Sequence, residues 1–253
     1  MKLILFDVDG TLCESGKKIT LEMSNIINDL VLQNIQIGIV GGGTYEKIIY
    51  QLDNKIKPDY IFSECGSVYH KLINDSYILI NKNNLRLEPE YTKIIFLIKT
   101  CLSYISKLEC MISGNFIDLR NGLFYISLPG MVATDEERNN FIENDKLHEH
   151  RKKLIDLLKL QAIELNINDY LDICFGGNVG IAIYPKKWNK TQVLSLLKNE
   201  SQNFTEMHYF GDKYLPNGND YDIMNANEII PHCVDNPTQT YDVLKNMICE
   251  FYK

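Results

Sequence analysis

The sequence predicts an α/β protein with a doubly wound parallel sheet and an inserted α+β segment. Three observations lead to this prediction. Short apolar runs alternate with amphipathic runs near both ends of the chain, which is typical of parallel strands joined by crossover helices. Between these two parts, short paired apolar runs and long charged runs replace that alternation. Two of the apolar runs lead directly into carboxylates, and sheets of this kind bind ligands at their carboxyl ends.

The outer parts of the chain supply the elements of the parallel sheet. Strands are expected at residues 2–7, 35–40, 60–62, 208–210 and 228–230. Helices are expected from Thr20 to about residue 34, from Thr44, from Lys190 and from about Thr238. Thr20 and Thr44 each precede an amphipathic run, where a side-chain oxygen can cap the first backbone N–H groups. The glycines at 41–43 end the second strand.

The middle of the chain predicts a separate α+β unit. Hairpin strands are expected at 76–80 with 85–87, at 115–119 with 123–127, and at 170–175 with 180–184. The Asn121-Gly122 pair is a strong signal for a tight hairpin turn. Helices are expected over 92–108 and over the charged run 136–165. We therefore expect a core domain of residues 1–82 and 186–253, and an inserted domain of residues 83–185.

Composition excludes several classes of partner. The formal charge is −7 and the pI is near 5.3, so the chain lacks the basic surface that nucleic acid requires. Its apolar runs are shorter than the roughly 18–20 residues of a membrane span. Seven cysteines are scattered without a CxxC pair, which favours reduced thiols over disulfides or a zinc site. Because strand 2–7 does not resemble a secretory signal, we expect a cytoplasmic protein.

Carboxylates follow two of the expected parallel strands. Asp7 and Asp9 come where the first strand stops, in the run Asp-Val-Asp-Gly-Thr. Asp212 and Asp220 follow the strand at 208–210. Aspartate is also common in turns and caps, but the preceding strand and the following Gly-Thr favour a functional role for the first pair. Since carboxyl ends of neighbouring parallel strands meet at one edge, the four side chains predict an oxygen cage suited to Mg²⁺.

These motifs resemble the haloacid dehalogenase (HAD) superfamily and, more closely, its eukaryotic-type phosphomannomutase branch. The matching stretches are residues 6–11, 19–20, 40–42 with 46–47, 116–117 with 120–122, 136–138, 188 with 190, 210–213 with 216, and 218–220. They span nearly the whole chain in the order of the family. The resemblance implies a Rossmann-like HAD core with an inserted, mobile cap of the C2 type, formed by residues 83–185.

The resemblance also implies roles for the strand-end residues. Asp7 is similar to the nucleophile that forms an aspartyl-phosphate and contributes an oxygen to the metal. Asp9 is similar to the general acid/base, with its backbone carbonyl facing the metal. Asp212 resembles a direct Mg²⁺ ligand and Asp220 a second or water-mediated one. Lys190 resembles the lysine that neutralises the phosphoryl oxygens, although a lysine at a helix start is usually only solvated surface.

Further contacts to phosphate or substrate are expected at Gly42, Gly43, Thr44, Arg120, Asn121 and Asn219. Gly43 stands where the family has a hydroxyl donor, and Thr44 lies beside it. Either Thr44 takes over that role, or the glycine-rich turn offers backbone N–H groups at a helix N-terminus. The alternative role of Thr44 is a helix N-cap.

The expected cap departs from the family at polar positions. The family clamps its second phosphate largely with three cap arginines, of which only Arg120 is present; Ser113 and Met131 stand at the other two positions. Other polar family positions are occupied by Gly16, Gly180 and Ala182. Candidates for replacing the lost charge are Lys17, Lys18, Lys186 and Lys187.

Three functions are compatible with these features. The first is a mutase that interconverts mannose 6-phosphate and mannose 1-phosphate, or a related hexose phosphate. The second is a phosphatase for a sugar phosphate or another phosphomonoester, in which water discharges the same phosphoenzyme. The third is a scaffold, which the clustered and mutually repelling carboxylates argue against. Because the family commonly pairs through its caps, the resemblance also implies a possible homodimer through residues 83–185.

Overall fold

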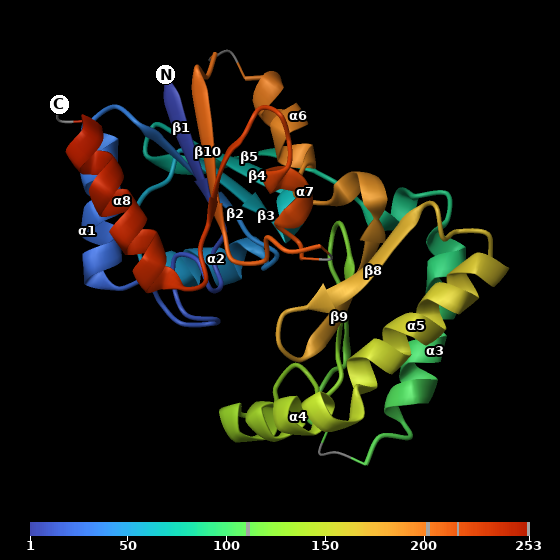
Figure 1. Cartoon of the computed structure of the whole chain (residues 1–253). Coiled ribbons are helices and arrows are strands. Elements are labelled where there is room, and N and C mark those ends of the chain that lie inside the picture. The colour runs from blue at the N-terminus through green and yellow to red at the C-terminus, as the bar shows by residue number, and fades with distance from the viewer. Residues whose placement is uncertain (110–111, 201–202, 217, 252–253) are drawn as a thin grey trace. The chain divides into compact units, whose positions relative to one another are not determined.

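The structure is a computed structural model of the 253-residue chain and describes residues 1–109, 112–200, 203–216 and 218–251. The chain divides into two compact units (Figure 1). Unit 1 comprises Met1–Asn83 with Lys187–Lys253, and unit 2 comprises Asn84–Lys186. Each unit has a β-sheet of its own. The fold is therefore α/β, as predicted, and the strands of an antiparallel sheet are inserted in sequence between the two halves of a mainly parallel one.

The sheet of unit 1 has seven strands in the order β11-β10-β1-β2-β3-β4-β5. Its strands are β1 (Lys2–Phe6), β2 (Gln36–Val40), β3 (Tyr60–Ser63), β4 (Val68–Ile73), β5 (Ser76–Lys82), β10 (Glu206–Gly211) and β11 (Ile230–Cys233). The strands from β11 to β3 run parallel, whereas β4 and β5 are antiparallel. The strands β10, β1 and β2 therefore end side by side.

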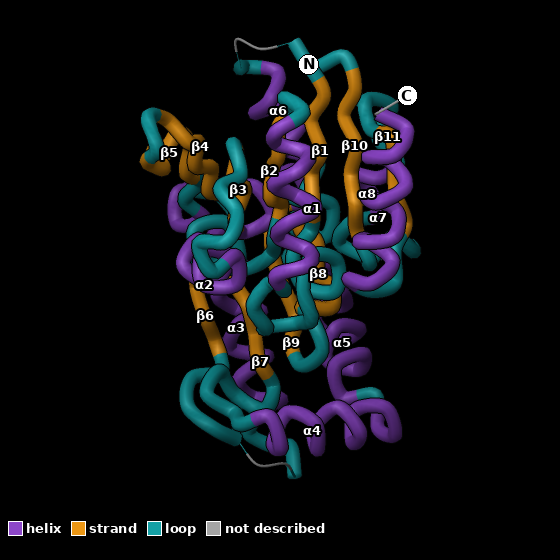
Figure 2. The backbone as a smooth tube through the Cα atoms, turned by 90° about the vertical axis from the view of Figure 1, so that its left-hand side faces the viewer, coloured by secondary structure: helices purple, strands orange, loops and turns teal. Residues whose placement is uncertain are grey.

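Helices cover both faces of this sheet, as the two views show (Figure 1 and Figure 2). They are α1 (Leu21–Leu32), α2 (Tyr45–Leu52), α6 (Gln192–Lys198), α7 (Tyr221–Met224) and α8 (Pro237–Phe251). Ile4 and Phe6 of β1 pack in the apolar cluster with α1, α2 and α8. Leu3 and Leu5 pack in the opposite cluster with α6 and α7. Burial on both faces explains why the central strand is continuously apolar in sequence.

Unit 2 has a four-stranded antiparallel sheet in the order β6-β7-β9-β8. Its elements are β6 (Ile117–Leu119), β7 (Phe124–Ser127), β8 (Leu171–Gly176), β9 (Gly180–Pro185), α3 (Tyr91–Ile105), α4 (Asp135–His148) and α5 (His150–Glu164). Helices α3 and α5 pack together, and α5 packs on β8 and β9. The two predicted hairpins, 115–127 and 170–184, are confirmed.

Several predicted elements were wrong. Strand β5 pairs with β4, which was not predicted, and not with residues 85–87. Residues Leu85–Leu87 form a 3₁₀ turn because the Asn84 side chain accepts a hydrogen bond from the Arg86 N–H. The expected helix 136–165 is two helices, since Glu149 has a left-handed backbone with φ of 52°. The strand expected at 228–230 lies at Ile230–Cys233.

The described cysteines are free thiols: Cys13, Cys65 and Cys101 are buried, Cys174 is partly buried and Cys233 is exposed. Cys110 lies outside the described residues, as does the side chain of Cys249. Among the helices of the described ranges, none has the length and apolar character needed to cross a membrane.

Candidate active site

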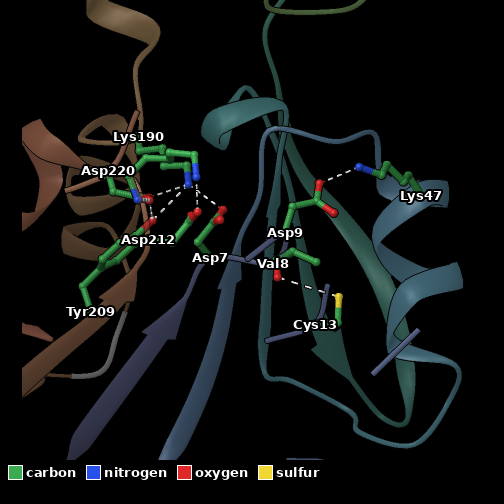
Figure 3. A network of polar contacts seen from close by, with 10 residues as sticks. Asp7, Val8, Asp9, Cys13, Lys47, Lys190, Tyr209, Asp212 and Asp220 are labelled. Atoms are coloured by element: carbon green, nitrogen blue, oxygen red, sulfur yellow. Dashed lines mark hydrogen bonds and ion pairs between the residues drawn. The ribbon is translucent and has the colours of Figure 1, made fainter. Parts of the chain in front are cut away.

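Asp7 and Asp212 meet because their strands are neighbours. Phe6, the last residue of β1, is in register with Phe210 of β10. The backbone N–H of Asp7 donates to the Phe210 carbonyl at 2.9 Å. Both carboxylates therefore leave the sheet at its carboxyl edge (Figure 3). This is the edge at which the sequence placed them.

Two glycines make room for the carboxylates. Gly10 has a φ of +89°, and a Cβ on it would lie 2.5 Å from Asp212 Oδ2. A Cβ on Gly211 would lie 2.6 Å from the carboxyl carbon of Asp220. Any side chain at either position would displace an aspartate. Glycine at these two positions therefore lets the backbone lie close to the carboxylates of Asp212 and Asp220.

Lys190 is buried in the middle of the acidic group. Its side chain comes from just before α6, and the residue is 1% exposed. The ammonium donates to Asp7 Oδ1 at 2.6 Å and to Asp220 Oδ1 at 2.6 Å. Burial alone would lower the pKa of Lys190, but the Asp220 and Asp7 carboxylates raise it well above its ordinary value. Lys190 is therefore a fixed positive charge, not a surface lysine.

Asp7 is the most perturbed carboxyl of the site. Burial raises its pKa to about 7, the Lys190 charge opposes that rise, and the Asp220 charge adds to it. Burial also raises the pKa of Asp212, with the Lys213 ammonium opposing. Such shifts are common where carboxylates are held close for catalysis or for metal binding.

Asp220 has both carboxylate oxygens hydrogen-bonded. Oδ1 accepts from Lys190 and from the Tyr209 hydroxyl, the latter at 2.5 Å. Oδ2 accepts from the backbone N–H of Lys213 at 2.9 Å. The residue is 0% exposed. Asp220 is therefore held rigidly beside Lys190.

The site has the oxygen donors of a hard cation site. One carboxylate oxygen each from Asp7, Asp212 and Asp220 lies within 4.8 Å of the others. Among the described residues, the buried oxygens without a hydrogen-bond partner include Asp212 Oδ1 and Asn219 Oδ1. Buried polar atoms normally have partners, and a set made only of carboxylate and amide oxygens suits Mg²⁺. The residues present therefore fit that ion.

Asp9 points away from Lys190 and toward α2 (Figure 3). Its carboxylate pairs with the Lys47 ammonium at 2.5 Å and accepts from the Gly16 N–H and the Gln51 amide, each at 2.8 Å. Burial would raise the pKa of Asp9, but the charge and hydrogen bond of Lys47, with the other two hydrogen bonds, lower it. The Asp9 carboxylate does not join the three-carboxylate group.

The glycine turn after β2 lies beside this site. A Cβ on Gly42 would lie 3.9 Å from Asn219 Nδ2, so Gly42 and Asn219 are neighbours. Thr44 caps α2, with its Oγ1 accepting from the Lys47 N–H at 3.4 Å. The N-cap alternative for Thr44 is therefore confirmed. Gly43 immediately precedes this cap.

The remaining expected substrate residues belong to unit 2. Arg120 pairs with Asp118 at 2.7 Å, and its guanidinium lies 4.8 Å from the centre of the Tyr125 ring. Asn121 is in the turn between β6 and β7. The Ser113 hydroxyl donates to Glu137 at 2.9 Å. A Cβ on Gly180 would lie 2.4 Å from the Tyr125 hydroxyl oxygen, so Tyr125 occupies the space that a side chain there would need.

Three residues of the site were missed from the sequence as functional candidates: Lys47 and Gln51, which bind Asp9, and Tyr209, which binds Lys190 and Asp220. Lys47 and Gln51 are four residues apart on α2 and so share a helix face. Tyr209 lies in β10, one residue before the strand-end Phe-Gly-Asp run. Strand alternation could have placed it on the side of α6 and α7.

The fold and the strand-end site define an enzyme of the HAD phosphotransferase type. A family model described as eukaryotic phosphomannomutase matches residues 23–250. A phosphomannomutase of Arabidopsis thaliana is 37% identical over 241 residues, covering 94% of this chain and 93% of the relative. One of Dendrobium officinale is 35% identical over 246 residues, covering 96% and 92%. The chain belongs to the eukaryotic phosphomannomutase family.

Solved structures show the same fold. An IMP-bound, N-terminally truncated IMP-nucleotidase of Plasmodium falciparum matches with a TM-score of 0.68 and 17% identity, covering 98% of this chain and 68% of that one. The C-terminal domain of a C. albicans trehalose-6-phosphate phosphatase matches with a TM-score of 0.65 and 14% identity, covering 97% and 91%. Both are HAD-type folds.

Proposed function

We propose that the protein is a Mg²⁺-dependent phosphomannomutase that transfers a phosphoryl group through Asp7. The observation that carries the proposal is the position of Lys190, whose buried ammonium holds Asp7 Oδ1 at 2.6 Å inside an oxygen-only donor set. A nucleophilic carboxylate needs a nearby positive charge to accept an anionic phosphate. The family and the name of its relatives favour mannose 1-phosphate and mannose 6-phosphate as substrates.

In the proposed reaction, Asp7 carries the phosphoryl group as an aspartyl-phosphate, and a free hydroxyl of the bound sugar monophosphate attacks the phosphorus and displaces the Asp7 oxygen. Asp7 then attacks the other phosphate of the sugar bisphosphate and displaces its sugar oxygen, which gives the isomeric monophosphate and re-forms the aspartyl-phosphate. Lys190 neutralises charge on Asp7 and on the phosphoryl oxygens in both steps. Because Lys190 is buried and paired on two sides, it needs no reorganisation when the phosphate arrives.

Asp9 is proposed as the general acid/base. Its lowered pKa makes it a carboxylate at neutral pH, ready to accept the proton of the attacking hydroxyl. To protonate the leaving sugar oxygen, it must first take up a proton. The ion pair with Lys47 opposes that uptake. Lys47 and Gln51 therefore influence the fraction of Asp9 that is protonated and can act as the acid.

Asp7, Asp212 and Asn219 are proposed to hold Mg²⁺, with the backbone carbonyl of Asp9 as a further ligand. When bound, the ion neutralises the phosphate and keeps Asp7 ionised. Asp220 has both oxygens already engaged, so we assign it to the support of Lys190. The sequence had placed it as a metal ligand.

Unit 2 is proposed as the cap that carries substrate contacts, with Arg120 and Asn121 among them. We also propose pairing of two chains through unit 2, because α3 and α5 expose apolar side chains. These are Phe96 and Leu102 on α3, and Leu157, Leu160 and Ile163 on α5. A cytoplasmic location, with neither nucleic acid nor membrane as partner, is proposed from the acidic composition.

A phosphatase is the second candidate function. A specific observation favours it: where the family has cap arginines, Ser113 binds Glu137 and Met131 offers no charge. A weaker hold on the sugar phosphate would let water reach the aspartyl-phosphate before the second hydroxyl does. The two functions share Asp7, Lys190 and the metal site, so they differ only in the acceptor.

One assay separates them. Mannose 1-phosphate would be incubated with Mg²⁺, with and without a sugar bisphosphate activator, and mannose 6-phosphate and free phosphate would both be followed. We expect turnover that stops in excess chelator and returns with Mg²⁺. Mannose 6-phosphate as main product supports the mutase, and free phosphate supports the phosphatase. Full turnover in chelator would refute the metal-dependent site altogether.

A further inference from the structure

We propose that Tyr209 is a positioning residue for phosphoryl transfer, acting through Lys190 and Asp220. The inference rests on the proposed function, since it assumes that Lys190 serves the phosphoryl group. Tyr209 is 0% exposed and lies on β10, and its hydroxyl reaches the centre of the acidic site (Figure 3). It accepts a hydrogen bond from Lys190 at 3.1 Å and donates one to Asp220 Oδ1 at 2.5 Å.

The three groups form a closed triangle. Lys190 and Tyr209 both donate to the same oxygen of Asp220, and Lys190 also donates to the tyrosine oxygen. An ammonium has three N–H donors, and here the described partners of Lys190 are Asp7, Asp220 and Tyr209. The phenol therefore accepts the third N–H of the ammonium, which its two carboxylate partners do not use. It also fixes the carboxylate that pairs with the ammonium.

The hydroxyl is not needed for packing. The ring of Tyr209 sits in an apolar cluster with Leu3, Leu5 and the residues of α6 and α7. A Cβ on Gly211 would lie 2.8 Å from Tyr209 Cε1, so the ring already fills this space. Phenylalanine would fill it equally, without burying a polar oxygen that must find partners. The role of the hydroxyl therefore lies in its contacts with the two charged groups.

The consequence concerns the transition state more than the ground state. Without the hydroxyl, Lys190 keeps its charge and both carboxylate partners, but one N–H loses its acceptor and Asp220 Oδ1 loses a donor. The ammonium and its Asp220 partner can then shift together. A small displacement of a positive charge near the transferred phosphoryl group destabilises the transition state more than the bound substrate. The reason is that negative charge in the transition state is spread over the three equatorial oxygens. Binding of the sugar part of the substrate does not depend on this small shift of the ammonium.

The test uses Tyr209→Phe in the full chain, with Tyr60→Phe as matched control. Tyr60, the first residue of β3, is also 0% exposed in the same apolar cluster, and its hydroxyl donates to Gln36 of β2 at 2.8 Å. For mannose 1-phosphate, we expect kcat to fall about 10- to 100-fold in Tyr209→Phe, with KM changed less than about threefold. Tyr60→Phe should keep kcat within about twofold of the wild-type value.

Two inhibitors separate positioning from a general structural defect. Orthovanadate can adopt the trigonal geometry of the transferred phosphoryl, whereas inorganic phosphate resembles the ground state. Tyr209→Phe should weaken inhibition by vanadate about as much as it lowers kcat, and should leave inhibition by phosphate nearly unchanged. Equal losses for both inhibitors, or a wild-type kcat in a folded Tyr209→Phe protein, would overturn the assignment.

Two more variants complete the test. If Tyr209→Phe does not melt cooperatively, Tyr209→4-aminophenylalanine retains a hydrogen-bonding group in place of the hydroxyl and should keep kcat within about threefold of wild type. A cooperatively melting Tyr209→4-aminophenylalanine protein with low kcat would contradict the proposal. Lys190→Met tests the underlying function: if it stays active, the role of Lys190 fails. If Lys190→Met is inactive and Tyr209→Phe is normal, only the role of Tyr209 fails.

Discussion

The charged groups at the strand ends of unit 1 and those around Arg120 in unit 2 differ in burial. In unit 1, Asp7, Lys190 and Asp220 are buried, and each is hydrogen-bonded to another member of the set. In unit 2, Arg120 stacks on Tyr125 and pairs with a partly exposed Asp118. Buried charges act strongly because water does not screen them, so their positions are tightly constrained. If unit 1 carries the reaction and unit 2 the choice of substrate, as proposed above, the two can change separately within one chain.

The largest expected effect comes from the proposed nucleophile of unit 1. Asp7→Asn should lower phosphoryl transfer by about 10³-fold or more, because an amide is a poor nucleophile. Asp53→Asn, at the partly exposed C-terminal end of α2, is the control and should retain activity. Turnover would be measured with mannose 1-phosphate and by trapping of phosphorylated protein. Activity above a few per cent, on a preparation free of wild-type enzyme, would remove Asp7 from this role.

Asp212 and Asp220 should separate metal binding from charge positioning. Asp212 has a buried oxygen without a described partner, whereas both oxygens of Asp220 are engaged. Asp212→Asn should raise the Mg²⁺ concentration for half-maximal activity about tenfold or more. Asp220→Asn should lower kcat with little change in that concentration. Calorimetric titration of Mg²⁺ checks both, and the reverse ranking would restore Asp220 as the principal ligand.

The sequence was most informative where one physical rule fixes the outcome. Parallel strands end at one edge of the sheet, so the order of apolar runs and aspartates is enough to place the carboxylates after β1 and β10 together. Thr20 and Thr44 could be placed as caps because the cap hydrogen bond is local. Burial of Lys190 and the contacts of Tyr209 depend on distant elements, so neither could be read from local sequence.

The errors have equally local causes. Strand β4 was missed because the half-buried His70 and Lys71 break its alternation. Lys71 is there because it pairs with Glu200, a residue far away in sequence. The break at Glu149 carries neither glycine nor proline. It is fixed by Asp145, which accepts hydrogen bonds from the backbone and the side chain of Arg151 beyond the break.

Restoring charge in unit 2 tests whether substrate choice lies there. Ser113→Arg with Met131→Arg should raise the ratio of mannose 6-phosphate to free phosphate about three- to tenfold, because a guanidinium can grip phosphate with two hydrogen bonds. Glu137 would attract the new side chain at 113, so Met131→Arg should contribute more. Ser113→Lys with Met131→Lys is the control, because it adds the same charge without a guanidinium that can make two parallel hydrogen bonds to phosphate. If wild type already releases almost no phosphate, the clamp uses other residues.

The smallest effect concerns stability at acid pH in unit 1. His208 Nδ1 and His232 Nε2 lie 2.9 Å apart across β10 and β11. One nitrogen must donate and the other accept, so protonating both rings breaks the pair. Burial, together with the His208 charge, lowers the pKa of His232 to about 4. Burial also lowers the pKa of His208, Glu206 opposes that effect, and Lys2 adds to it.

The sign of the pH dependence follows from these lowered pKa values. Well above pH 6.5 both histidines are neutral in the folded and unfolded chain, so the pair adds no pH dependence. As pH falls from there toward 4, the unfolded chain binds protons that the folded chain does not, and the free energy of unfolding decreases. Between pH 7 and 5 we expect a loss of about 1–2 kcal/mol from His232, measured by urea unfolding. His232→Phe, which preserves a ring against Phe210, should remove most of that loss, while the exposed His148→Gln should not. If the free energy of unfolding of His232→Phe depends on pH as in the wild type, His232 titrates normally in the folded chain. The shifts of pKa that burial causes in unit 1 would then be confined to the candidate active site.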